Sequence, residues 1–177
     1  MLARRIRPIQ GPLARSRGIP YSGGETRTMI EQAGVIAIRD GAEGLRVLLI
    51  PSRQVKDRWV IPKGHVEPEL SPARAAELEA YEEAGVRGEV ATAPLGSYRY
   101  QKRGQEHEVQ VFLMRVEESL DCWPERTQRF RRWCTLEDAA ERVEEVELKA
   151  LLLSVAAHAQ RGSLHFEPQQ AAEEPPR

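Results

Sequence analysis

The chain has 177 residues, of which 41% are hydrophobic and 30% charged, which fits one globular domain with a substantial core and disfavours a second domain. Its 26 basic and 27 acidic residues nearly cancel, so a net charge of -1 excludes a general attraction to nucleic acid or to an anionic membrane. The two cysteines are too few for a disulfide framework and no apolar run approaches the roughly 20 residues needed to cross a bilayer, so we expect a cytoplasmic protein.

Residues 1–28 are rich in arginine, contain three prolines and show no sustained hydrophobic period. We expect them to form a flexible N-terminal tail. Three other interpretations stay open: an organelle transit peptide, which the prolines disfavour because they oppose an amphipathic helix, a disordered arm that attracts phosphate, and a true start at Met29. We expect the folded domain over residues 29–162, followed by a flexible C-terminal tail over residues 163–177.

The first ordered elements are expected to be strands. Two β-branched and apolar runs, residues 32–40 and 45–53, flank a turn-forming segment and predict a hairpin. A third short strand should end before Pro62. This third strand covers residues 58–61, and short apolar or alternating runs predict further strands over residues 88–92, 96–101 and 108–116. A turn that contains a proline then leads to residues 130–134.

A helix is expected over residues 72–84. Ser71 is a good N-cap, Pro72 suits the first helical position, and Gly85 supplies the left-handed conformation that ends a helix. Toward the C-terminus, a capping threonine and apolar residues at helical spacing predict two more helices, over residues 136–143 and 146–160.

Three glutamates of the first helix share one side. At about 100° per residue, Glu79 and Glu83 lie roughly 40° apart around the axis, and Glu82 lies about 60° to the other side of Glu79. Unpaired carboxylates this close repel each other, and hard divalent cations with oxygen ligands would neutralise them. A solvated acidic face is the better interpretation of an isolated Glu-x-x-Glu-Glu motif. Here the preceding strand, the segment Pro62-Lys63-Gly64 and the capped helix favour a metal site instead.

The segment GHVEPELSPARAAELEAYEEAGV, residues 64–86, resembles a Nudix box. The box has a glycine, a glutamate after five residues, and then, after seven more, Arg-Glu-apolar-any-Glu-Glu-any-Gly-apolar. Its first glycine and its three late acidic positions match this chain at Gly64, Glu79, Glu82 and Glu83.

Two positions of the box differ. Leu70 stands where the pattern has its first glutamate, and Leu78 stands where it has its arginine. An apolar pair in place of a supporting ion pair can be neutral for stability. We therefore expect Leu70 and Leu78 to pack against each other and to hold the loop on the helix. Losing the arginine lowers the expected activity, because groups that orient metal ligands typically change metal affinity or activity roughly 10- to 100-fold.

The resemblance implies an α/β class protein with the Nudix fold, an α/β/α sandwich around a mixed β-sheet, with the box helix on one face and the C-terminal helix on the other. It implies a carbonyl metal ligand at Gly64, carboxylate ligands at Glu79 and Glu83, and Glu82 as a water-mediated ligand or the base. The implied cofactor is Mg²⁺ or Mn²⁺, and the implied reaction is hydrolysis of a phosphoric anhydride.

Three further segments, VLLIPSRQVKDRWVIPKGHVEPE, EHEVQVFLMRV and CWPERTQRFRRWCTLEDAAE, resemble the diphosphoinositol polyphosphate phosphohydrolase branch of the family, whose members also cleave diadenosine polyphosphates. We therefore expect a pyrophosphohydrolase, monomeric or homodimeric, whose partner is a phosphorylated small molecule: a diadenosine polyphosphate, an inositol pyrophosphate or a related nucleoside diphosphate-X compound. Two alternatives stay open. One is an ADP-ribose or nucleoside triphosphate pyrophosphatase, and the other is a weakly active or inactive ligand-binding module with the same fold.

Basic residues bracket the box on both sides. A polyphosphate needs cations that the carboxylates do not supply, and arginine suits bidentate phosphate contact. Any single basic residue is more often a solvated surface charge, but a converging set favours a highly phosphorylated substrate. The candidate substrate-binding residues are Arg53, Arg58, Lys63, Arg99, Lys102 and Arg132.

Overall fold

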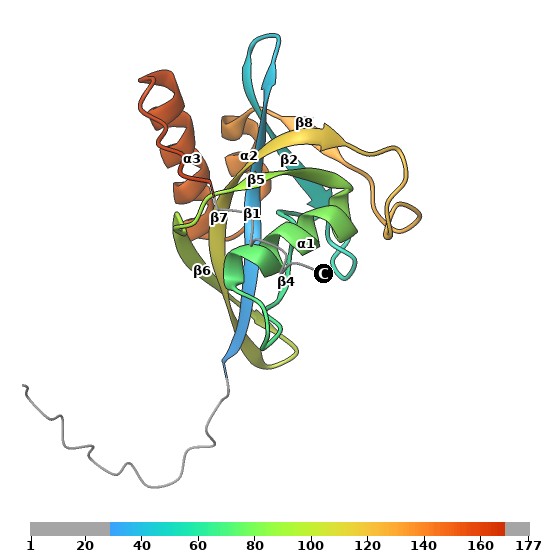
Figure 1. The fold of residues 1–177 in the computed structure, drawn as a ribbon. Helices are drawn as coiled ribbons and strands as arrows, with labels where there is room; N and C mark the ends of the chain where they lie inside the picture. The colour runs from blue at the N-terminus through green and yellow to red at the C-terminus, as the bar shows by residue number, and fades with distance from the viewer. Residues whose placement is uncertain (1–28, 169–177) are drawn as a thin grey trace, which may run out of the picture.

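The computed structural model describes residues 29–168 (Figure 1). Eight strands and three helices follow one another in this range. The strands are β1 Ile30–Gly41, β2 Gly44–Pro51, β3 Trp59–Val60, β4 Lys63–His65, β5 Val86–Val90, β6 Gly96–Lys102, β7 Gln105–Ser119 and β8 Arg132–Cys134, and the helices are α1 Pro72–Ala84, α2 Leu136–Arg142 and α3 Val146–Gln160.

The strands form one mixed sheet. Its main path runs β3-β2-β1-β7-β5, with β4 paired to β1, β6 to β7 and β8 to β2. The central pair, β1 and β7, is parallel, with Ile30 opposite His107 and Ile38 opposite Arg115, whereas the other pairs are antiparallel. Alternate residues of a strand point to opposite sides of the sheet. Because consecutive residues of β1, such as Val35 and Ile36, are buried, both faces of this strand are covered.

The helices cover both faces of the sheet (Figure 1). On one face, the small alanines of α1 allow the helix to lie close to Val35 and Phe112 of the central strands. On the other face, Leu148 and Leu152 of α3 pack with Ile36 and, with α2, close the second core cluster. The expected α/β/α sandwich around a mixed sheet, with the two helices on opposite faces, is therefore confirmed.

Helix α1 has the predicted bounds and the predicted caps. The Ser71 hydroxyl accepts a hydrogen bond from the Arg74 backbone N–H at 3.3 Å, and Pro72 is the first helical residue. Gly85 ends the helix with φ 60°, a left-handed conformation that disfavours side chains. The ring of Trp123 packs against Gly85, where a Cβ atom would come within 2.6 Å of the indole.

This close approach predicts a large stability loss for Gly85→Ala. The left-handed backbone costs about 1–2 kcal/mol for an alanine, and overpacking against a ring costs about 1–3 kcal/mol, so the free energy of unfolding should fall by about 2–5 kcal/mol in urea titrations. Gly44→Ala is the matched control, because Gly44 has φ 109° but no neighbouring atom within 4 Å. Equal losses in the two variants would contradict the role given to Trp123.

Part of the expected C-terminal tail belongs to the folded domain. The Thr92 N–H donates to the Glu167 carbonyl at 3.0 Å, and Ala91 forms a bridge with Pro168. Leu164 and Phe166 pack against the core cluster that contains Leu148 and Leu152 of α3. Burial of these two apolar side chains holds the segment on the domain, although most of the residues around them in the sequence are polar. The folded part of the described chain therefore extends beyond residue 162, where we expected the domain to end.

The expected tails 1–28 and 169–177 lie outside the described residues. Within residues 29–168, no helix is both long enough and apolar enough to span a bilayer.

Candidate active site

A pocket of about 420 Å³ opens between the sheet and α1, where Lys63 and Gly64 of β4 lie opposite Glu79 and Glu83. Its walls come from β1, the stretch from the end of β2 to β4, α1, the β6–β7 hairpin, the loop before β8 and the start of α3. The pocket therefore forms only when segments far apart in the sequence are folded together. Carboxylates of α1 line one part of it, and several basic side chains together with neutral polar ones line other parts.

Gly64 and Glu79 touch at the floor of this pocket. A Cβ atom at Gly64 would overlap the carboxylate of Glu79, so only glycine leaves room for that carboxylate. Gly64 lies on β4, which pairs with Ala33 of β1, and Glu79 lies on α1. The sheet and the helix thus hold the backbone of Gly64 next to the carboxylate of Glu79, although the two residues are 15 positions apart in the sequence.

Glu79 carries an unstable negative charge. Its burial, and then the neighbouring carboxylates Glu83, Glu82 and Glu125, raise the pKa of Glu79 to about 7, although Lys63 opposes the shift. Within residues 29–168, no hydrogen bond or ion pair to the Glu79 side chain is present. The local charge therefore favours a bound cation.

Glu83 is held from two sides. Its Oε2 accepts a hydrogen bond from the Lys63 backbone N–H at 2.9 Å, and its Oε1 accepts one from the Arg129 guanidinium. Burial raises the pKa of Glu83, while the Arg129 charge and the Lys63 N–H lower it. Because each carboxylate oxygen has two lone pairs, these bonds leave one acceptor position on each oxygen.

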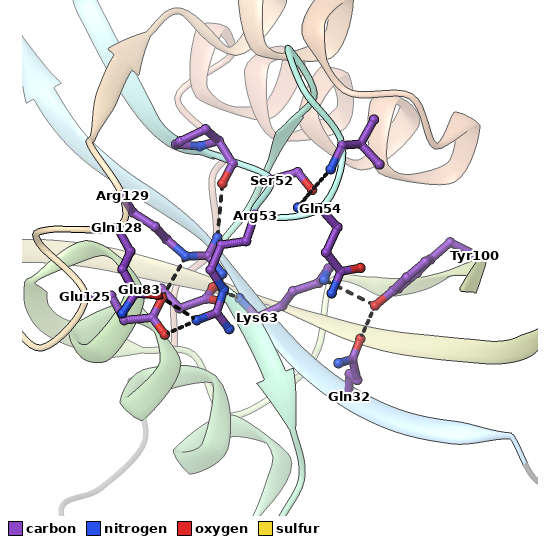
Figure 2. A network of polar contacts seen from close by, with 12 residues as sticks. Gln32, Ser52, Arg53, Gln54, Lys63, Glu83, Tyr100, Glu125, Gln128 and Arg129 are labelled. Carbon is purple, nitrogen blue, oxygen red and sulfur yellow. Dashed lines mark hydrogen bonds and ion pairs between the residues drawn. The ribbon is translucent and has the colours of Figure 1, made fainter. Parts of the chain in front are cut away.

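Arg129 links Glu83 to the rim of the pocket (Figure 2). Its Nε donates to Glu125 at 2.7 Å, and one terminal nitrogen donates to the Pro51 carbonyl at 3.1 Å. Glu125 in turn accepts a hydrogen bond from Arg53 at 2.8 Å. Alternating charges therefore run from the half-exposed Arg53 to the buried Glu83, and they tie the loop before β8 to β2 and α1.

Four of the six candidate substrate-binding residues line the pocket, namely Arg53, Arg58, Lys63 and Lys102. Arg58 is paired with Glu145 at 2.5 Å and with Glu144 at 3.3 Å. Burial, the largest effect, lowers the pKa of Lys63, whose Nζ donates to the Tyr100 hydroxyl at 3.3 Å. Arg58, and Arg53 through Glu125, are therefore partly neutralised by ion pairs within the protein.

The tip of the β6–β7 hairpin supplies unneutralised charge. Lys102 and Arg103 both line the pocket, and neither has an ion pair among the described residues. Arg103 has φ 51°, in the left-handed region that a glycine or asparagine would occupy at lower cost. The turn thus directs two free cations at the pocket.

Three predicted site residues lie outside the pocket lining. Glu82 is exposed on α1, although its charge still raises the pKa of Glu79. Arg99 pairs with Glu108 across the hairpin at 3.1 Å, because it lies on the opposite side of β6 from Tyr98 and Tyr100. Arg132 on β8 lies over the Trp59 ring, 5.5 Å from its centroid.

The donor chemistry fits a hard divalent cation. The two clustered carboxylates, Glu79 and Glu83, have free acceptor positions beside the backbone of Gly64. In the part of the chain that the structure describes, no three acidic, histidine or cysteine side chains are gathered as a ready metal cage. The site therefore suits an ion such as Mg²⁺, which retains water ligands and takes substrate phosphates instead of a full set of protein ligands.

Sequence reasoning missed Arg129, Glu125 and Glu145. Arg129 is only 7% exposed, although it stands in a polar loop among other arginines. Glu145 lines the pocket from the start of α3 and has a buried Oε2 without a hydrogen bond. No periodicity separates these residues from ordinary surface charges, because their burial depends on how the loops dock.

The chain is similar in sequence to known proteins. The model of the NUDIX domain family matches residues 30–153. The chain is 38% identical over 111 residues to diphosphoinositol polyphosphate phosphohydrolase 3-alpha of Mus musculus, covering 62% of this chain and 66% of that protein. It is also 38% identical over 111 residues to diphosphoinositol polyphosphate phosphohydrolase 2 of Rattus norvegicus, covering 62% of this chain and 60% of that protein. The match thus spans slightly less than two thirds of these relatives.

Solved structures share the fold. A binary complex of an Ap4A hydrolase from C. elegans has a TM-score of 0.63 and 24% identity, covering 75% of this chain and 99% of that one. A second structure of C. elegans Ap4A hydrolase has a TM-score of 0.59 and 26% identity, covering 73% of this chain and 98% of that one.

Proposed function

The chain belongs to the NUDIX domain family, and from this membership we propose that it is a metal-dependent pyrophosphohydrolase that cleaves a phosphoric anhydride. The observation that carries the proposal is the carboxylate of Glu79, which lies against Gly64 and beside Glu83 in a pocket also lined by basic side chains. Such a pocket offers ligands for a cation and counter-charges for phosphate groups.

We assign Glu79 and Glu83 as the metal-binding carboxylates, with the Gly64 carbonyl beside them. Bound Mg²⁺ or Mn²⁺ would polarise phosphoryl oxygens and lower the pKa of a water molecule that attacks phosphorus. Glu82, which is exposed at the edge of the same helix, is left as a water-mediated ligand or as a base that works from outside the pocket lining. Glu83 is oriented before the substrate arrives, because Lys63 and Arg129 fix both of its oxygens.

For the substrate, we propose a compound with several phosphate groups, either a diadenosine polyphosphate or an inositol pyrophosphate. The names of the relatives and of the similar solved structures support both classes. The free cations of the hairpin tip, Lys102 and Arg103, support a substrate that extends beyond a single diphosphate. Both thiols, Cys122 and Cys134, are free, which supports a reducing cytoplasm as the compartment.

A substrate panel tests this proposal. Phosphate release and product identity are measured for diadenosine tetraphosphate, a diphosphoinositol polyphosphate, ADP-ribose and a nucleoside triphosphate, each with Mg²⁺, Mn²⁺ or a chelator. We expect metal-dependent turnover, fastest on one of the first two compounds. Fastest turnover of ADP-ribose or the triphosphate would overturn the substrate class. Ligand-induced thermal stabilisation without turnover of any compound would overturn the enzyme proposal and indicate a binding module.

Lys102→Gln tests the role of the hairpin tip. Removing one unpaired phosphate-binding cation should raise KM about 10-fold and change kcat less than about threefold, because the lost contact acts on bound substrate and transition state alike. Lys149→Gln is the matched control, since Lys149 lies on α3 outside the pocket. An unchanged KM in Lys102→Gln would remove Lys102 from the set of substrate-binding residues.

A further inference from the structure

We propose that Arg129 is a built-in counter-cation of the active site, which stabilises the charge of Glu83 in the metal-free protein and opposes the binding of a divalent ion at Glu83. This inference rests on the proposed metal role of Glu83. It goes beyond that role, because it states that Arg129, which lies outside α1, lowers the affinity of the site for the metal.

The burial of the pair requires such a partner. Glu83 is 6% exposed and Arg129 is 7% exposed, so neither charge is stabilised by water. A buried charge without a partner destabilises a fold strongly, whereas a hydrogen-bonded pair does not. The Lys63 N–H is the only other donor to Glu83 among residues 29–168, and it carries no net charge. Arg129 is therefore the only charged hydrogen-bond donor to Glu83 among these residues, and the Lys63 ammonium stabilises the charge only through space.

The geometry of Arg129 leaves it at the site in both states. Glu125 and the Pro51 carbonyl hold two of its other N–H groups, at 2.7 Å and 3.1 Å (Figure 2). The guanidinium therefore cannot swing away when the charge of Glu83 is shared with a metal ion. A divalent ion at Glu83 would lie close to a fixed positive charge, and this repulsion opposes metal binding.

Arg129 is not a substitute for the arginine that the box lacks. Position 78 lies roughly 140° around α1 from Glu83, so a side chain there would point to another side of the helix. Arg129 instead reaches Glu83 from the loop before β8 and donates to it directly. Its effect on the metal is thus a separate property of this chain.

Two substitutions separate the charge of Arg129 from its hydrogen bonds. Arg129→Met removes the charge and leaves Glu83 and Glu79 with excess negative charge, so the metal-free protein should melt at a lower temperature. Mn²⁺ should then bind about 5-fold or more tightly than to the unaltered protein, and it should raise the melting temperature further. Arg129→Lys retains the charge but not the planar fork, so its Mn²⁺ affinity should stay within about threefold of the unaltered protein.

The experiment is a calorimetric titration with Mn²⁺ alone, together with melting curves in chelator and in Mn²⁺, in mildly alkaline buffer. Weaker Mn²⁺ binding in Arg129→Met than in the unaltered protein would overturn the inference, because Arg129 would then support the metal ligand and not compete with the ion. If Arg129→Met does not fold, at least 10-fold weaker binding in Arg129→Lys would overturn it. Absence of Mn²⁺ binding to the unaltered protein would instead overturn the proposed metal site itself.

Discussion

Glu79→Gln is expected to lower kcat by about 100-fold or more while leaving the melting temperature of the metal-free protein equal or higher. Activity falls because a neutral amide is a poor ligand for a hard divalent cation, and loss of metal-bound chemistry has effects of this order. Stability does not fall, because burial and the charges of Glu83 and Glu82 already disfavour the ionised carboxylate. Initial rates with Mg²⁺ and melting curves in chelator measure both effects.

The matched control is Glu77→Gln, on the same helix. Glu77 pairs with Arg74 outside the pocket, so the control should retain the activity of the unaltered protein and lose at most about 1 kcal/mol of stability. Full activity in Glu79→Gln would contradict the assignment of the metal site. A large stability loss in Glu79→Gln would show that the carboxylate has a structural partner instead.

Gly64→Ala is expected to abolish most activity through a single methyl group. The added Cβ would occupy the position of the Glu79 carboxylate, which must move away. Because a displacement of about 1 Å in a catalytic group can cost about 100-fold in rate, kcat should fall by that order. The carboxylate is the far end of a flexible side chain, so the free energy of unfolding should change by only about 1 kcal/mol or less.

Gly162→Ala is the contrasting control. Gly162 has φ 64° and no atom within 4 Å of an added Cβ, and it lies after α3, away from the pocket. Alanine there should lower stability by about 1–2 kcal/mol and leave kcat unchanged. If Gly64→Ala were fully active, the close approach of Gly64 and Glu79 would have no catalytic meaning.

Local signals in the sequence predicted the helix that carries the acidic residues. Ser71, Pro72 and Gly85 determine where α1 begins and ends, and all three act within a few residues of themselves. The strands were also recognisable from apolar runs, but the parallel pairing of β1 with β7 was not. That pairing depends on contacts between distant segments, and the docking of residues 163–168 on the core depends on the same kind of contact.

Helix geometry in the sequence predicted that acidic residues of α1 gather on one side, whereas the residues that reach the pocket through loop docking were missed. Gly64, Glu79 and Glu83 come together because strand β4, which carries Gly64, lies against the capped helix α1. The two-residue period of a strand would have shown that Lys102 and Arg99 point to opposite sides of β6. Lys102 lies on the same side as Tyr98 and Tyr100, and Arg99 lies on the other side. No such pattern exists for Arg129.

The parallel pairing of β1 with β7 has a consequence for how the chain folds. The ladder joins residues 30–38 to residues 107–115, so the centre of the sheet cannot close until most of the domain has been synthesised. Until then the β1–β2 hairpin presents an apolar strand with one open edge. Pairing over so long a separation folds slowly, and the emerging chain is exposed to edge-to-edge association during that interval.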